Sequence, residues 1–73
     1  MNFISKSQLE RLKKEYPTGT RVELVNMNDA YTKLVPGDKG TVEFIDDMGT
    51  IFVRWDNGSS LGVVWGEDEI KKI

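Results

Sequence analysis

The chain has 73 residues and contains neither cysteine nor histidine. Without cysteine it can form no disulfide and offers no thiolate nucleophile. Without histidine it lacks the commonest general base, the commonest metal ligand and the usual pH switch. The sequence also shows no dinucleotide fingerprint, phosphate loop or calcium-loop spacing. We therefore expect a binding protein rather than an enzyme, with no cofactor and no metal.

Long apolar runs are absent as well. No stretch approaches the roughly 20 apolar residues that a membrane-spanning helix needs, and the apolar run at the start is too short for a signal peptide. We expect a cytoplasmic protein without a membrane partner. A core for a chain of this size uses most of its residues, so we expect a single domain over residues 1–73.

Charge is unevenly distributed along the chain. Residues 1–21 hold five basic and two acidic side chains, a net charge of +3, whereas residues 22–73 hold five basic and ten acidic ones, a net charge of −5. Affinity for DNA or RNA depends mainly on neutralising phosphates with lysine and arginine. The acidic larger part therefore disfavours nucleic acid and favours a cationic partner, although solvated surfaces also explain both charged parts.

The first segment predicts a helix over residues 5–16. Ser5 is a good N-cap, and Gln8 occupies the reciprocal position of a capping box. A stripe of apolar side chains follows at helical spacing, formed by Leu9, Leu12 and Tyr16. Pro17 ends the helix. Because so short a helix is unstable alone in water, its apolar stripe must pack on the rest of the chain.

Beyond Gly19 the apolar residues alternate with a period of two. This pattern predicts five short strands, over residues 21–25, 39–45, 50–55, 60–65 and 70–73. One long loop, two tight hairpins and a single turn connect them. This connectivity predicts an all-β fold, a small five-stranded SH3-like barrel over residues 20–73 behind one short N-terminal helix. The alternation places Phe44 and Trp55 on the inward face.

Three glycines carry specific expectations. Asn57-Gly58 fits a two-residue hairpin, but a three-residue loop with a left-handed Gly58 pairs Ile51 with Val63 and buries the apolar set together. We therefore favour the three-residue loop. Gly37 and Gly40 are expected to let the chain turn tightly and enter the barrel where a side chain would clash.

Two aromatic residues are candidates for an exposed binding patch. Tyr31 lies in the long loop and Trp65 at the end of the fourth strand, and the acidic residues around them are Asp29, Asp46, Asp47 and Glu67. In the alternative interpretation, Tyr31 anchors its loop and Trp65 caps the core. The clustered carboxylates are typical of solvated turns and do not predict an acid–base pair.

Four stretches of the sequence resemble a known family: Glu15–Leu24, Pro36–Val42, Trp55–Leu61 and Gly66–Asp68. The chain is similar there to an uncharacterised bacterial and phage family, domain of unknown function 4314. The resemblance covers nearly the whole chain, including the helix. It implies a host among bacteria, their phages or other mobile elements, and it supplies no activity and no site residues.

These observations predict a small accessory interaction module. The expected partner is a protein, recognised through a basic or an extended segment. The alternative is a nucleic-acid-associated barrel that uses the basic face of the N-terminal helix. These two hypotheses differ in their dependence on salt, because each neutralised phosphate releases a counterion.

Overall fold

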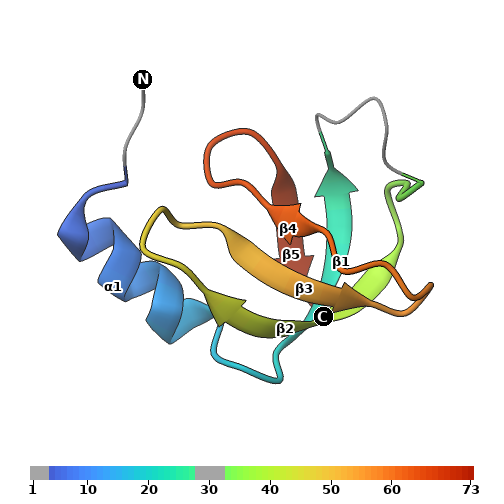
Figure 1. Ribbon diagram of the computed structural model, residues 1–73, viewed down its shortest axis with the longest axis horizontal. Coiled ribbons are helices and arrows are strands. Elements are labelled where there is room, and N and C mark those ends of the chain that lie inside the picture. The colour runs from blue at the N-terminus through green and yellow to red at the C-terminus, as the bar shows by residue number, and fades with distance from the viewer. Residues whose placement is uncertain (1–3, 28–32) are drawn as a thin grey trace.

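A helix and five strands make up the part of the chain that the computed structural model describes, residues 4–27 and 33–73 (Figure 1). The elements are α1 (Lys6–Glu15), β1 (Arg21–Asn26), β2 (Lys39–Ile45), β3 (Ile51–Trp55), β4 (Gly62–Val63) and β5 (Glu69–Lys72). The strands form one antiparallel sheet in the order β4-β3-β2-β1-β5. Within the same residues, no helix has the length and apolar composition that crossing a membrane requires.

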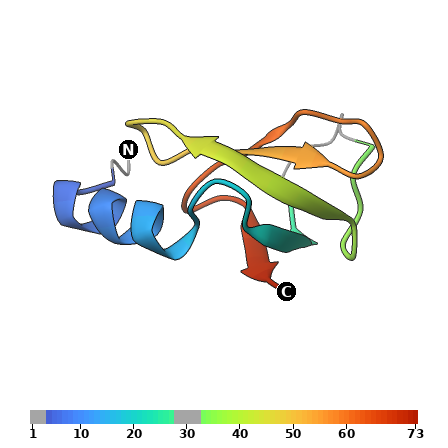
Figure 2. The same ribbon diagram turned by 90° about the horizontal axis from the view of Figure 1, so that it is seen from below.

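The sheet bends around one hydrophobic core. Its edge strands β4 and β5 are not paired with each other, so the expected barrel is not closed by hydrogen bonds among the described residues. Yet Val63 of β4 and Ile70 of β5 belong to one apolar cluster, although a flat sheet would hold its outer strands roughly 19 Å apart. Figure 2 shows the same curvature, with β1 and β5 on a lower level than β2 and β3.

The hairpin between β3 and β4 has the register predicted for a three-residue loop. Ile51 pairs with Val63, the Trp55 N–H donates to the Ser59 carbonyl at 2.9 Å, and Gly58 has a φ of 96°. Trp55 is buried, as expected, and its indole Nε1–H donates to the Leu61 carbonyl at 2.9 Å. The indole therefore fills the core and also fixes the chain that enters β4.

The predicted inward orientation of Phe44 is wrong. Val42 is buried opposite Val53, but Phe44 pairs with Phe52 on the outer face and is 55% exposed. The register between β2 and β3 shifts after Val42, so Glu43 is an extra residue. Such a bulge reverses which later residues face the core. A strict alternation along residues 39–45 could not reveal it.

The helix begins and ends close to the predicted positions. The Ser5 hydroxyl accepts the Gln8 N–H and the Gln8 side chain accepts the Ser5 N–H, which completes the capping box. Leu12 and Tyr16 pack against the core cluster, whereas Leu9 is half-buried and is not among the residues packed on it. The predicted packing of the apolar stripe is therefore confirmed for its C-terminal part. The Thr18 hydroxyl then donates to the Glu43 carbonyl at 2.7 Å. This bond ties the end of the helical segment to the bulge in β2.

Replacing Gly40 should destabilise the protein. A Cβ at this position would lie 2.5 Å from Val53 Cγ1 and 2.9 Å from the Arg54 carbonyl oxygen. Because the core is closely packed, we expect Gly40→Ala to lower the free energy of unfolding by about 1–3 kcal/mol. Urea denaturation measures the change. Lys39→Ala, at an exposed neighbouring position, is the control, and equal midpoints for the two variants would contradict the packing.

Shortening Leu12 should loosen the helix from the sheet. Leu12 is half-buried against the core cluster, so Leu12→Ala should lower the free energy of unfolding by about 2 kcal/mol. Lys14→Ala, on the same helix but exposed, should change it by less than about 0.5 kcal/mol. Thermal unfolding followed by circular dichroism compares them. If both variants melt like the parent chain, the helix does not contribute to the stability of the sheet.

Candidate interaction surface

The predicted patch is only partly covered by the described residues. Asp29 and Tyr31 lie outside them. Asp46 is half-buried, and its Oδ1 accepts the N–H groups of Met48 at 3.0 Å and Thr50 at 2.9 Å. Its carboxylate therefore holds the turn between β2 and β3 together. An aspartate at the start of a turn commonly accepts backbone N–H groups that follow it, so its position in the sequence is a signal for this role.

The other three predicted residues lie in two turns. Asp47 is in the turn between β2 and β3, and Trp65 and Glu67 are in the turn that follows β4. The Asp47 side chain is 98% exposed, and its Oδ1 lies 3.8 Å from Lys13 Nζ. Trp65 is half-buried against the turn, where a Cβ on Gly49 would lie 3.3 Å from Trp65 Cβ. Glu67 is exposed. Of the predicted acidic residues that the structure describes, Asp47 and Glu67 thus present their carboxylates to solvent, and Asp47 does so beside Lys13.

A stacked pair of phenyl rings occupies the outer face of the sheet. The ring centroids of Phe44 and Phe52 are 4.4 Å apart and the rings are nearly parallel, at 15°. Phe52 also lies over the next strand, because a Cβ on Gly62 would be 3.6 Å from two of its ring atoms. The pair therefore crosses β2 and β3 and reaches β4. It is supported from the side by Gly62, where any larger residue would also meet Thr50.

Two ion pairs engage carboxylates on the same outer face. Arg21 donates to both carboxylate oxygens of Asp56, at 2.8 and 2.7 Å, and Lys71 Nζ lies 3.5 Å from Glu23 Oε2. The hydrogen bond and charge of Arg21 lower the pKa of the Asp56 carboxyl. By contrast, none of the ion pairs among the described residues involves Arg54, which is exposed.

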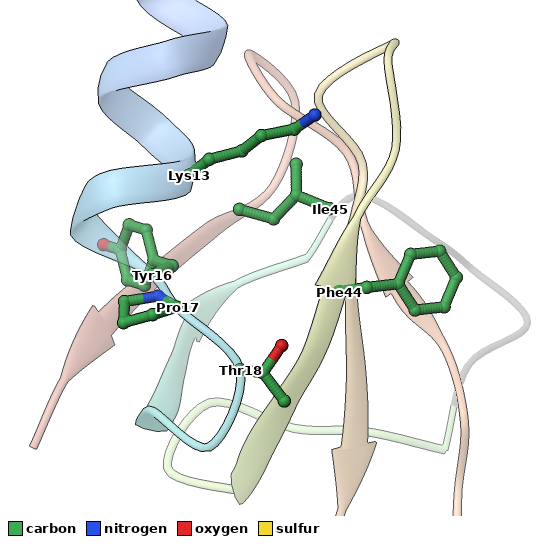
Figure 3. A pocket seen from close by; sticks show the side chains of 6 residues that line it. All are labelled: Lys13, Tyr16, Pro17, Thr18, Phe44 and Ile45. Atoms are coloured by element: carbon green, nitrogen blue, oxygen red, sulfur yellow. The ribbon is translucent and has the colours of Figure 1, made fainter.

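A shallow groove of about 300 Å³ lies between the end of α1 and β2. It is lined by Lys13, Tyr16, Pro17, Thr18, Phe44 and Ile45. Figure 3 shows the Ile45 side chain pointing toward the helix and the Lys13 side chain reaching over it, while the Phe44 ring points to the other side of β2. Burial, with a smaller effect from Glu15, raises the pKa of the Tyr16 phenol, which therefore stays neutral.

The groove is small for a cofactor. Its volume is at the lower limit of pockets that hold small molecules, and its lining side chains come from the end of α1, the segment that follows it and β2 (Figure 3). No group of three or more candidate metal ligands occurs within residues 4–27 and 33–73. The arrangement offers apolar contact area and single positive charges, which is suited to holding a side chain of a partner.

Comparison with known families is informative over almost the whole chain. A family model described as a domain of unknown function (DUF4314) matches residues 5–73. The chain belongs to this family. The match to DUF4314 begins at the helix N-cap Ser5 and includes α1 and all five strands. No curated protein matches the chain.

The pairing of Asp56 with Arg21 should make stability depend on pH. The folded protein lowers the pKa of Asp56 below its ordinary value of 3.8. The stabilisation that the charged carboxylate provides by pairing with Arg21 is therefore fully present above pH 3.8. It is lost as the pH falls through the lower pKa of the folded state. We expect Asp56→Asn to be less stable than the parent chain at neutral pH.

Urea denaturation at a series of pH values measures the difference in the free energy of unfolding between the parent chain and Asp56→Asn. It should narrow steadily below pH 3.8, because protonated Asp56 and asparagine are both uncharged. A difference that is independent of pH would mean that the hydrogen bonds, and not the charge of the carboxylate, provide the stabilisation.

Proposed function

We propose that the chain is a small accessory module that binds a protein partner and carries out no catalysis itself. The observation that carries this proposal is the stacked pair of Phe44 and Phe52 on the outer face of the sheet. Aromatic side chains are enriched at protein interfaces, where each supplies a large contact area at a low cost in conformational entropy. A paired, exposed phenyl surface on a rigid sheet has these properties.

The shape of this surface favours an extended segment of the partner. The phenyl pair lies on strands, and the groove beside it accommodates a single side chain rather than a whole helix. Single-stranded nucleic acid, which also stacks on aromatic rings, is less well suited. Each phenyl ring already covers one face of the other, and the larger part of the chain, residues 22–73, has a net charge of −5.

We further propose that the bent sheet is a small SH3-like barrel that stays open between β4 and β5. The strand order, the tight hairpins and the shared core of the two edge strands support it. The resemblance to a bacterial and phage family supports a host among bacteria and their phages, with the module acting in the cytoplasm. Such a fold does not specify a partner, so the partner must be found by experiment.

Quantitative affinity capture from a lysate of the encoding bacterium tests the protein-binding function. We expect the parent chain to enrich a protein that Phe44→Ser no longer retains, because that change removes one ring of the pair. Val35→Ser is the matched control, since Val35 is 58% exposed and is not part of the pair. It should enrich the protein to the same level as the parent chain.

Treatment of the lysate with nuclease separates the two classes of partner. Capture that survives the nuclease and depends on Phe44 supports the proposal. Material that disappears with nuclease, falls steeply with salt and is lost in the Lys13→Glu/Lys14→Glu variant would instead establish nucleic-acid binding through α1. Equal enrichment by Phe44→Ser and the parent chain would contradict a role for the phenyl pair.

A further inference from the structure

The surface that carries the phenyl pair also indicates the chemistry of its partner. Resting on the proposed function, we propose that the partner segment is acidic, with apolar side chains flanked by aspartate or glutamate. The apolar side chains lie against Phe44 and Phe52, and the flanking carboxylates pair with Arg54 on one side and Lys13 on the other. The overall acidic charge of residues 22–73 suggests a basic partner segment instead, so the two predictions have opposite signs of charge.

Arg54 provides the first positive charge. It follows Phe52 by two residues on the same strand, so both side chains lie on the outer face, roughly 7 Å apart along the strand. Two carboxylates on this face are already engaged, since Asp56 is held by Arg21 and Glu23 by Lys71. Glu43, the extra residue before Phe44, is exposed but forms no ion pair with Arg54. The side chain opposite Arg54 is the neutral Thr41, whose hydroxyl accepts from Arg21. The guanidinium of Arg54 is therefore not paired with any carboxylate of the described residues and is available to a partner.

Lys13 provides the second positive charge, across β2. It lines the groove together with Phe44 and Ile45, and its side chain extends over Ile45 (Figure 3). Its ion pair with Asp47 is long, at 3.8 Å, and the Asp47 side chain is 98% exposed. Exposed pairs of this kind contribute little, so a carboxylate of the partner can replace Asp47 beside Lys13. No acidic side chain lines the groove.

The distances suit a short extended peptide. β3 and β2 are neighbouring strands, about 5 Å apart, and the Lys13 side chain extends over Ile45 of β2 from the helix. An extended chain advances roughly 3.3 Å per residue, so a short segment crosses these elements. Outside this surface, the acidic turn of Glu67, Asp68 and Glu69 repels an acidic segment, which restricts where such a segment can bind.

Selection from a random peptide library displayed on phage, with the intact chain as bait, tests the inference. We expect the enriched peptides to contain one or two large apolar residues flanked by aspartate or glutamate. Binding of the leading peptide is then measured by fluorescence anisotropy. Its Kd should rise at least tenfold in Lys13→Glu/Arg54→Glu. A version of that peptide with lysine replacing each acidic residue should bind this variant better than it binds the parent chain.

Lys6→Glu is the matched control. It reverses one charge on the same helix, about 10 Å from Lys13 along the axis, and should leave the Kd within twofold. Amide signals of Phe44, Ile45, Phe52 and Arg54 should shift when the peptide is added. Circular dichroism confirms that each variant keeps its fold.

The possible failures are distinguishable. Peptides that are basic or uncharged, or binding that tolerates both charge reversals but is lost in Phe44→Ser, would overturn the acidic segment and leave the phenyl surface as a protein-binding site. Binding that tolerates Phe44→Ser as well, or no enrichment of any peptide over the empty support, would count against both the inference and the proposed function.

Discussion

The hydrogen bond from the Thr18 hydroxyl to the carbonyl of Glu43, at 2.7 Å, lies at the point where β2 changes the face that its side chains occupy. The extra residue turns Phe44 outward onto Phe52 and turns Ile45 toward the helix. The same segment is also bonded to β2 just before this point, since the Gly19 N–H donates to the Val42 carbonyl and the Val42 N–H donates to the Thr20 carbonyl. Without the bulge there would be neither an exposed phenyl pair nor a groove beside it.

Electrostatics on this small protein is local rather than global. The net charge of −2 describes the chain as a whole, but the acidic side chains are not equally available. Asp46 binds backbone N–H groups and Asp56 binds Arg21. Because screening in physiological salt limits interactions between exposed charges to about 8 Å, the charges close to the phenyl pair matter more there than the net charge of the chain.

Much of the fold could be predicted because the local signals agree with one another. The capping box at Ser5 and Gln8, the left-handed turn at Gly58 and the close approach at Gly40 each follow from residue chemistry. The buried position of Trp55 follows from alternation over a regular strand. These features depend on a few neighbouring residues, so the sequence is sufficient to locate them.

The candidate surface was less predictable, because it depends on contacts between distant residues. The outward position of Phe44 requires an extra residue in β2 that Thr18, 25 residues earlier, helps to hold. The role of Asp46 likewise depends on the geometry of its turn. The sequence does contain one signal. Phe44 and Ile45 are adjacent apolar residues and so interrupt the alternation along β2, but this does not by itself place the bulge at Glu43.

The edges of the sheet have a consequence for how the protein behaves at high concentration. Exposed strand edges are templates for pairing with other chains, and short or charged edges oppose such aggregation. Here β4 has two residues, and β5 has four, among them Glu69, Lys71 and Lys72. Neither edge offers a long apolar strand to a second copy. A sheet with such edges can keep two phenyl rings in contact with water without growing into a fibril.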